Sequence, residues 1–572
     1  MSWIPVSRFR LVLVFSVWLA LAALAEGAAP TPGVESANEP SHALLTATGI
    51  HLIDWIILVV YLLVLGAIGL NFAGKQHTVD DIVRAGGGMG MLTVGMSLMA
   101  ALNSGIDYIQ TPPAVFEYGM VFVVSFVSWI FLWPYVSRIT IDFYRRLDVY
   151  SAYEYLERRF DVSVRTLAAV MFILWRVAWM GTALYVPCLA INAASSGQIP
   201  VTPMAIVLGT VVTVYTMLGG LKAVVWADVT QFCIMFSGLA ATAAIVVYHV
   251  PGGFSEILSV CSADGKLDMW AMPDTMSTAS HWQKIVLFFQ EDVTLIGICL
   301  AVTINRFAAF TADQVAIQRF ETARSLRDAK RAFIINAVTD TIWMVVLGFV
   351  GMGLYTFYQH IALPADIEKD QLDHLLPHFM STMFPIGCTG LVIAAISAAS
   401  LSSVDSAINS TSSIILVDFY NRLIKGHVRP VEDLSASEQR RQVTIFRWAA
   451  VGFGILGTII ACNVGRLGPI YVAAAKMIGA FNGPVFGIFL LGMWSARTGR
   501  GGVWIGGFSG LLAGCYAAFF SSLGWVWPPS IGVLTTLGVG YVASLLIGGG
   551  RLDPDALTVR KVLSVGPSSK AT

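Results

Sequence analysis

One apolar run of the chain carries a row of hydroxyl groups and a carboxylate. The segment SLSSVDSAINSTSS (400–413) follows GLVIAAISAA and precedes IILVDFY. On a helix, positions three and four apart lie on one face. The residues that share this face are Ala399, Ser402, Ser403, Ser406, Ser410 and Ser413. A packing seam between helices would explain the Ala and Ser residues, but not Asp405 beside them. Hydroxyl and carboxylate oxygens, with carbonyls from an unwound neighbour, instead predict a site for a hard cation such as sodium.

The unwound neighbour is predicted in an earlier apolar run. The stretch SLMAALNSGIDYIQTPP (97–113) places Asn, Ser, Gly and Asp107 in its middle and a Pro-Pro pair at its end. Such interruption of an apolar span is typical of a broken helix that lines a binding site. The stretch INRFAAFTADQ (304–314) is a second polar interruption. If the two breaks correspond, the chain holds two inverted five-helix halves.

Several charged side chains fall inside apolar runs. They are Asp107, Arg176, Asp228, Arg306, Asp340, Asp405 and Lys476. A charge at membrane depth costs at least about 2.5–3.5 kcal/mol and marks an ion or solute path by default. The alternative is that these groups form structural salt bridges with one another inside the bundle. Seven such groups in one chain make a purely structural role for all of them a weaker interpretation.

The composition indicates a multi-span membrane protein. The 572 residues are 56% hydrophobic and 12% charged, with a mean hydropathy of +0.72 and a formal net charge of +0. Soluble domains carry about 25% charged residues. The charges lie in short loops, so no basic face is available for nucleic acid. No Gly-rich phosphate loop or HExxH motif occurs, which argues against an enzyme, and no cysteine or metal-ligand spacing suggests a disulfide framework or a metal centre.

Apolar runs predict about thirteen membrane spans. They lie near 52–72, 91–116, 120–142, 166–194, 203–219, 226–249, 287–320, 333–358, 387–416, 443–463, 469–493, 502–522 and 530–549. Lys and Arg residues concentrate in alternate loops, among them Arg145, Arg146, Arg327 and Arg440. This asymmetry predicts an outside N-terminus and a cytoplasmic C-terminus in the cell inner (plasma) membrane.

The N-terminus resembles a signal peptide. RFR precedes the apolar core LVLVFSVWLALAAL, and ALA ends at Ala25, although an uncleaved anchor helix is the alternative. The expected organisation is a signal peptide (1–25), a periplasmic N-terminal segment (26–51), an extra first helix (52–72), a first five-helix repeat (91–250), a second repeat (284–493), two additional helices (502–549) and a cytoplasmic tail (550–572).

Several motifs together resemble the sodium:solute symporter family. They are SAYEYLERRF (151–160), YTMLGGLKAVVWADVTQ (215–231), DQVAIQRF (313–320), SSVDSAINST (402–411) and GPVFGIFLLGM (483–493). The resemblance covers about residues 52 to 500, and the GG-L-x-A-V-x-W-x-D-x-x-Q run is its most specific part. It implies an all-α, LeuT-like fold of two inverted five-helix repeats, with one extra helix before and two after.

The same resemblance implies two cation sites. The main sodium site would use backbone carbonyls of Ala100, Asn103 and Ala399 and the hydroxyls of Ser402 and Ser403. Relatives with a second cation are similar to this chain at Asp228 and at hydroxyls of the 400–413 segment, notably Ser406, so the expected second cation site comprises Asp228, Ser402, Asp405 and Ser406. The chain departs from those relatives at Asp405, where a serine is expected, so either sodium or a proton remains possible there.

The resemblance also implies a solute site. The residues implied are Asp107, Arg176, Arg306, Phe310, Asp340 and Lys476. An arginine can grip a carboxylate through two parallel hydrogen bonds, so Arg176 favours an anionic solute. Lys476 could serve the same end or neutralise Asp405 or Asp107.

The expected function is sodium-coupled import, by alternating access, of a small polar anion such as a carboxylate or sugar acid. Symport of a neutral sugar or polyol is the alternative, and a solute sensor on the same fold is another. The expected partners are the solute, sodium ions and the lipid bilayer, with no organic cofactor, no nucleic acid and no obligate protein partner.

Overall fold

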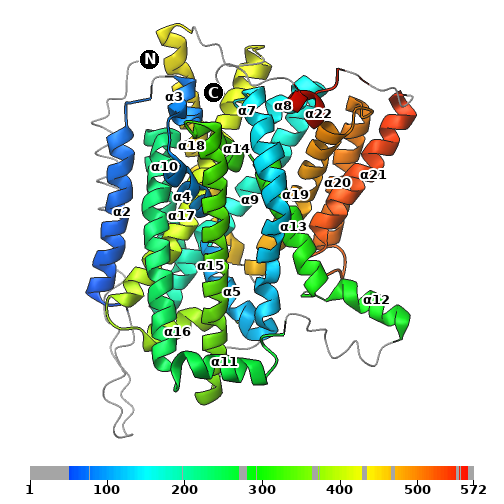
Figure 1. Ribbon diagram of the computed structural model, residues 1–572. Coiled ribbons are helices and arrows are strands. Elements are labelled where there is room, and N and C mark those ends of the chain that lie inside the picture. The colour runs from blue at the N-terminus through cyan, green and yellow to red at the C-terminus, as the bar shows by residue number, and fades with distance from the viewer. Residues whose placement is uncertain are drawn as a thin grey trace, which may run out of the picture.

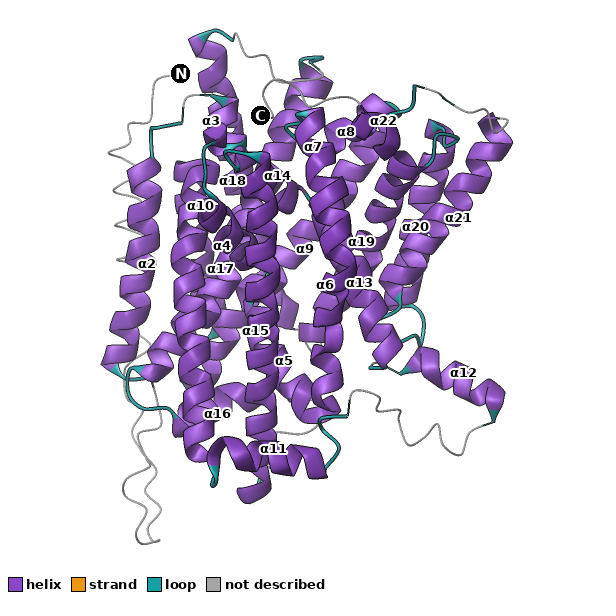
Figure 2. Ribbon diagram, viewed as in Figure 1, coloured by secondary structure: helices purple, strands orange, loops and turns teal. Residues whose placement is uncertain are grey.

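The structure is a computed structural model made almost entirely of helices (Figure 1; Figure 2). It describes residues 50–76, 78–195, 197–268, 280–291, 293–363, 372, 374–427, 434–465, 470–548, 553 and 555–564. No strand occurs within these ranges, and the one isolated bridge pairs Met89 with Ala323. The predicted signal peptide and nearly all of segment 26–51 lie outside the described residues.

Ten helical segments of the described chain are long and apolar enough to cross a membrane. They are Leu52–Phe72, Val162–Ala194, Val201–His249, His281–Thr311, Leu326–His360, Cys388–Ile424, Ala436–Val464, Ala474–Trp494, Arg500–Phe519 and Pro528–Ile547. A pair bent by 44°, Gly105–Val124 with Ser128–Leu147, raises the number to eleven if it is one span. The predicted number of thirteen is not tested by this count.

The first predicted break is present. Helix α4 (Met91–Leu102) stops at Asn103, whose backbone is extended, and α5 (Gly105–Tyr118) begins after Ser104. The Ser104 hydroxyl accepts the Ile106 N–H, and the Asp107 carboxylate accepts the Ser104 N–H, so both side chains cap α5. The Pro-Pro pair lies inside α5 rather than at the break.

The second predicted break is also present. Helix α13 (Leu295–Thr311) ends at Ala312, and α14 (Gln314–Thr322) begins after Asp313. The Asp313 carboxylate caps α14 by accepting the Val315 N–H at 2.8 Å. Each break frees backbone groups that a continuous helix would have paired, so the two breaks supply polar groups in the middle of the bundle.

Helix α10 (Val201–His249) contains a third discontinuity, at Gly220. At about 1.5 Å per residue, its 49 residues would span roughly 74 Å if straight, against a hydrocarbon core of about 30 Å. Gly220 has φ +55°, a conformation that favours glycine, and it divides α10 between the two spans predicted at 203–219 and 226–249.

Helix α2 (Leu52–Phe72), which lies at the outer left edge in Figure 1, is tied to α10 and to α17 (Cys388–Ile414). The Asp54 carboxylate accepts the N–H groups of Gly387 and Gly390 at 2.9 and 2.7 Å. A Cβ on Gly69 would lie 2.6 Å from Tyr215 Cβ, so a larger residue at position 69 would force α2 and α10 apart.

Charged side chains cluster beside α3 (Val79–Val83), α7 (Ile141–Leu147) and α14, three helices that lie toward the top of Figure 1. Arg84 pairs with Asp148 at 2.8 Å and lies 3.8 Å from Glu321, which is also 3.9 Å from Arg145. Burial raises the pKa of Glu321 to about 7, because lost hydration outweighs attraction to the two arginines. The Met89–Ala323 bridge joins the chain segments beside this cluster.

Candidate solute and cation sites

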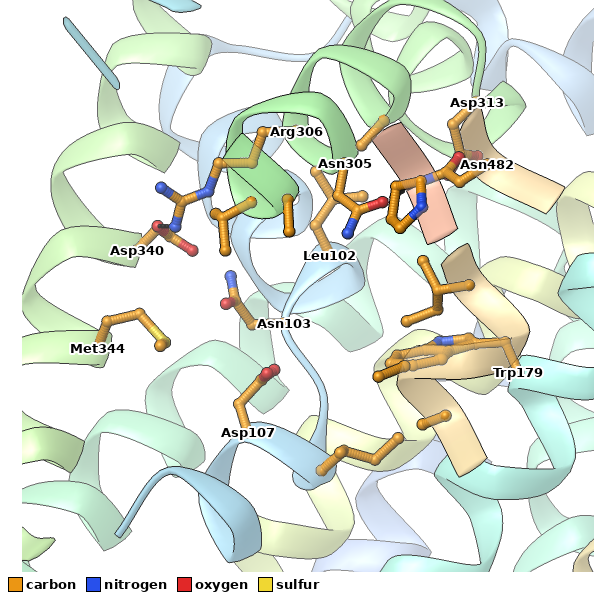
Figure 3. A pocket seen from close by; sticks show the side chains of 18 of the residues that line it. Leu102, Asn103, Asp107, Trp179, Asn305, Arg306, Asp313, Asp340, Met344 and Asn482 are labelled. Atoms are coloured by element: carbon orange, nitrogen blue, oxygen red, sulfur yellow. Dashed lines mark hydrogen bonds and ion pairs between the residues drawn. The ribbon is translucent and has the colours of Figure 1, made fainter. Parts of the chain in front are cut away.

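A cavity of about 290 Å³ lies between the two broken helices. Its walls come from α4 and α5, α13 and Asp313, α9 (Val162–Ala194), α15 (Leu326–His360) and α19 (Ile470–Trp494). Figure 3 shows Asn103 and Asp107 at one break, Asn305, Arg306 and Asp313 at the other, and Asp340 and Met344 from α15. Five of the six residues predicted for the solute, all except Lys476, line this cavity.

Arg176 faces the cavity from α9 and already has a carboxylate partner. Its Nη2 pairs with Asp313 Oδ2, and its guanidinium lies 4.1 Å from the centre of the Trp175 ring. Among the residues that the structure describes, the Nε atom of Arg176 and the Nε1 atom of Trp175 are buried without a hydrogen-bond partner. These two orphaned donors are groups that an incoming acceptor oxygen could satisfy, since an unpaired buried donor is costly.

Arg306 and Asp340 form a second pair in the wall. Their Nη2 and Oδ2 atoms are 2.5 Å apart, and Asp340 also accepts the Trp129 Nε1–H at 3.0 Å. Arg306 lies over the Trp129 ring at 4.6 Å and donates to Ser128 Oγ at 2.7 Å. Phe310 packs beside Trp129 with ring centres 5.7 Å apart, which makes this wall aromatic.

Lys476 is the predicted solute residue that the structure places elsewhere. It is half-buried on α19, whose Ala474, Ala475 and Ile478 line the cavity instead. In the described structure no ion pair joins Lys476 to Asp107 or to Asp405. Asp405 instead accepts hydrogen bonds from Tyr215 and Ser406. A neutralising role for Lys476 therefore stays a prediction.

The five groups predicted for the main sodium site converge where α17 passes the α4–α5 break. Ser402 Oγ is 2.8 Å from the Ala100 carbonyl oxygen and 3.0 Å from that of Ala399. Ser403 Oγ is 3.2 Å from the carbonyl oxygen of Asn103. These three carbonyls and two hydroxyls are all uncharged oxygens, the ligand type that suits a small hard cation. The hydroxyl hydrogens that now reach the carbonyls would have to turn away when a cation enters.

The residues predicted for a second cation also lie near one another. Asp228 on α10 and Asp405 on α17 are both fully buried. Ser406 Oγ donates to Asp405 Oδ1 at 3.1 Å, and Tyr215 OH donates to Asp405 Oδ2 at 2.6 Å. Ser402 instead hydrogen-bonds the carbonyls of the main sodium site.

A guanidinium occupies part of this second region. Arg319, on α14, donates from Nη2 to Asp228 Oδ2 at 2.7 Å and also to Ser406 Oγ. Its Nε donates to Ser97 Oγ at 2.8 Å, and Ser97 donates to the same Asp228 oxygen at 2.5 Å. Within the described part of the chain, Asp228 Oδ1 is buried without a hydrogen-bond partner. Arg319 thus supplies one positive charge beside two carboxylates, a net charge of −1 if both are ionised.

Sequence reasoning missed Asp313 and Arg319, the partners of Arg176 and Asp228. Both stand in DQVAIQRF, next to the second break, and both were treated as part of a family motif rather than as buried charges. Both residues lie inside the apolar run 287–320, and this position could have indicated that they are buried charges. Each is at most 1% exposed.

A family model described as the sodium:solute symporter family matches residues 82–514. The chain belongs to this family. The symporter is therefore a multi-pass membrane transporter, not an enzyme, and Na⁺ is its co-transported ion. Its partners are a small-molecule solute and sodium.

This symporter is similar in sequence to two curated relatives and in structure to one solved protein. It is 29% identical to the sodium/sialic acid symporter SiaT of Proteus mirabilis (strain HI4320), over 86% of this chain and 95% of the relative. It is 28% identical to the sodium-coupled monocarboxylate transporter 1 of Mus musculus, over 83% of this chain and 74% of the relative.

The solved structure is a substrate-bound, outward-open Na⁺-coupled sialic acid symporter, in which a novel Na⁺ site was found. It superposes with a TM-score of 0.75 at 28% identity and covers 87% of this chain and 98% of that chain. The all-α, LeuT-like fold expected from the sequence is confirmed.

Proposed function

We propose that this symporter imports a small polar solute that carries a carboxylate, driven by sodium and by alternating access. The observation that carries the proposal is Arg176, whose guanidinium lines the cavity, rests on Trp175 and keeps an unpaired Nε. A planar guanidinium can bind Asp313 through one edge and a solute carboxylate through another. The names of the sialic acid and monocarboxylate relatives support the same class of solute.

The sodium gradient is sufficient for such import. One sodium ion moving inward through 100 mV releases about 2.3 kcal/mol, and a tenfold sodium gradient adds about 1.4 kcal/mol. A monovalent anion loses about 2.3 kcal/mol of this to the same potential, so a second cation matters more for an acid than for a sugar. We place the protein in the cell inner membrane with its N-terminus outside and its C-terminus in the cytoplasm, as the loop charges favour.

A neutral sugar or polyol is the second candidate solute. Amide side chains line the cavity, and two of them carry buried atoms without partners, Gln110 Nε2 and Asn336 Oδ1. Unpaired amide groups suit hydroxyls, which both donate and accept hydrogen bonds.

A thermal-shift panel of purified protein in detergent tests the proposal. Sugar acids, monocarboxylates, amino acids and neutral sugars are each added with and without sodium, and the ligands that raise the melting temperature are then tested for uptake in proteoliposomes. We expect carboxylates to stabilise the protein in sodium. Stabilisation by neutral sugars alone would overturn the carboxylate assignment.

The role of Arg176 is tested with the charge-conserving Arg176→Lys variant. Lysine keeps the charge but loses the planar fork, so affinity for the carboxylate should fall by at least about tenfold. Arg324→Lys, at an exposed arginine, is the matched control. Since Arg176→Ala would leave Asp313 buried without its partner, Arg176→Ala is combined with Asp313→Asn. Undiminished carboxylate affinity in both Arg176 variants would contradict the proposal.

A further inference from the structure

The charged groups that line the cavity do not balance. Among its described lining residues are three carboxylates (Asp107, Asp313 and Asp340) and two guanidinium groups (Arg176 and Arg306). Arg176 pairs with Asp313, and Arg306 pairs with Asp340. Asp107 is left over, and it forms no ion pair within the described structure. The formal charge of the cavity wall is therefore −1.

The carboxylate of Asp107 is only partly used by the protein. One oxygen, Oδ2, accepts the Ser104 N–H at 2.7 Å in the capping of α5. Asp107 is half-buried, and Figure 3 shows its carboxylate directed into the cavity toward the level of Asn103. A carboxylate can accept about four hydrogen bonds, so most of its capacity remains for a molecule in the cavity.

The helix ends at the break do not cancel this charge. The N-terminus of α5 carries a partial positive charge of about +0.5, which stabilises Asp107. Helix α4 ends at Leu102, three residues before α5 begins at Gly105, and its C-terminus carries a partial negative charge of about the same size. The two ends oppose each other, and the formal negative charge of Asp107 remains beside a cavity that water leaves when a solute binds.

We propose that the solute is a zwitterion, with a cationic nitrogen held by Asp107 and a carboxylate held by Arg176. This rests on the proposed function, which supplies the carboxylate. A plain monocarboxylate would change the combined formal charge of wall and solute from −1 to −2. A zwitterion would leave this charge at −1, which is equal and opposite to the charge of one sodium ion in the main site. Burying unbalanced charge is costly, so this balance favours an amino acid or amino sugar acid over a simple acid.

The size of the cavity agrees with this class. A volume of about 290 Å³ is at the lower end of ligand pockets, which typically run from about 300 to 1,000 Å³. Asp107 and Arg176 come from different elements, α5 and α9, so two charged groups on one small molecule would join them. Binding would then draw the broken helix toward α9.

The experiment uses trios of probes that share one carbon skeleton. The first trio is L-leucine, its 2-hydroxy acid and 4-methylpentanoate, and the second is 4-aminobutyrate, 4-hydroxybutyrate and butyrate. Dissociation constants are measured on purified protein in sodium by thermal shift and calorimetry. In at least one trio, the wild-type protein should bind the amine-bearing acid at least about tenfold more tightly than the plain acid, since a charge-assisted hydrogen bond is gained.

The variant Asp107→Asn keeps the shape and an acceptor for the Ser104 N–H while removing the charge. It should lose the preference for the amine-bearing acid. Glu117→Gln, an exposed carboxylate at the other end of α5, is the matched control and should keep that preference. Sodium titration of each variant without solute reports whether the protein is folded and binds sodium.

Four results overturn the zwitterion assignment. Equal or tighter binding of the plain acid, abolished in Arg176→Lys, would leave the proposed function standing and remove this inference. An amine preference that survives in Asp107→Asn would remove Asp107 as its cause. A loss of sodium affinity in Asp107→Asn, with no change in the amine preference, would make Asp107 a cation ligand instead. Binding of butylamine but of no carboxylate would retain Asp107 as an ammonium site and refute the carboxylate of the proposed function.

Discussion

Replacement of Arg319 by methionine gives the sharpest test of the polar cluster beside α17. Arg319 and Asp228 are at most 1% exposed, and their Nη2 and Oδ2 atoms are 2.7 Å apart. Methionine has a similar length and no charge. In Arg319→Met, Asp228 therefore stays buried with only the Ser97 hydroxyl as partner, near a second carboxylate on Asp405.

The expected loss of stability is large. Removing one partner of a buried ion pair costs about 3–5 kcal/mol, because the remaining charge is left uncompensated. The double variant Arg319→Met/Asp228→Asn removes both charges and should recover most of that loss. Arg319→Met should also bind a cation where the guanidinium was. At a sodium concentration 100 times the dissociation constant, the added stabilisation is about 2.7 kcal/mol.

The assay is the melting temperature in detergent over a range of sodium concentrations, with choline replacing sodium. Arg165→Met is the matched control, because Arg165 is equally buried and pairs with Asp418 at 2.6 Å. It should destabilise the protein without adding sodium dependence. Arg319→Met with the stability and sodium response of the wild type would refute the reasoning. Equal sodium responses in Arg319→Met and Arg165→Met would refute the cation site alone.

Three other substitutions have definite expected outcomes. Ser403→Ala removes one of five oxygens at the main sodium site and should raise the sodium concentration for half-maximal uptake by about tenfold, with normal expression. Asp405→Ser should retain transport with altered cation affinity or pH dependence, and reversal potentials in proteoliposomes that match the wild type at every pH would exclude a second coupled cation. The pKa of Glu321 is raised to about 7 from 4.5, so the folded state binds the extra proton and its stability contribution falls as pH rises from about 4.5 to 7. Glu321→Gln should flatten the pH dependence of the melting temperature in that window, and an unchanged slope would contradict the burial argument.

Much of the fold could be predicted because a bilayer imposes simple rules. Spans must be apolar and helical, so Gly and polar residues inside an apolar run were strong signals of the breaks at Asn103–Ser104 and Ala312–Asp313. The Pro-Pro pair was misleading, since it lies within α5. The sequence did not indicate that α2 is held by Asp54 against the start of α17, because that contact joins residues 333 positions apart.

The candidate sites could be predicted only one residue at a time. Family motifs predicted oxygens that lie near the α4–α5 break in the structure, but which charged side chains pair with one another depends on the three-dimensional fold. The sequence therefore predicted a solute-binding role for Arg176 and a cation-binding role for Asp228, but not their ion pairs with Asp313 and Arg319. That Asp107 is the excess carboxylate follows only from the structure, in which Asp313 and Asp340 each pair with an arginine of the cavity wall.

The Asp54 contact has a consequence for the order in which the chain assembles. Asp54 is 1% exposed in the folded protein, and its partner Gly387 follows 333 residues later. At about 5–20 residues per second, the ribosome makes Gly387 about 17–67 s after Asp54. During this interval α2 is in the membrane while the Asp54 carboxylate, near the N-terminal end of the helix, lacks the N–H groups of Gly387 and Gly390. A nascent chain arrested before residue 387 should therefore hold α2 through its packing on α10 alone, and completion of α17 adds the contacts of Asp54.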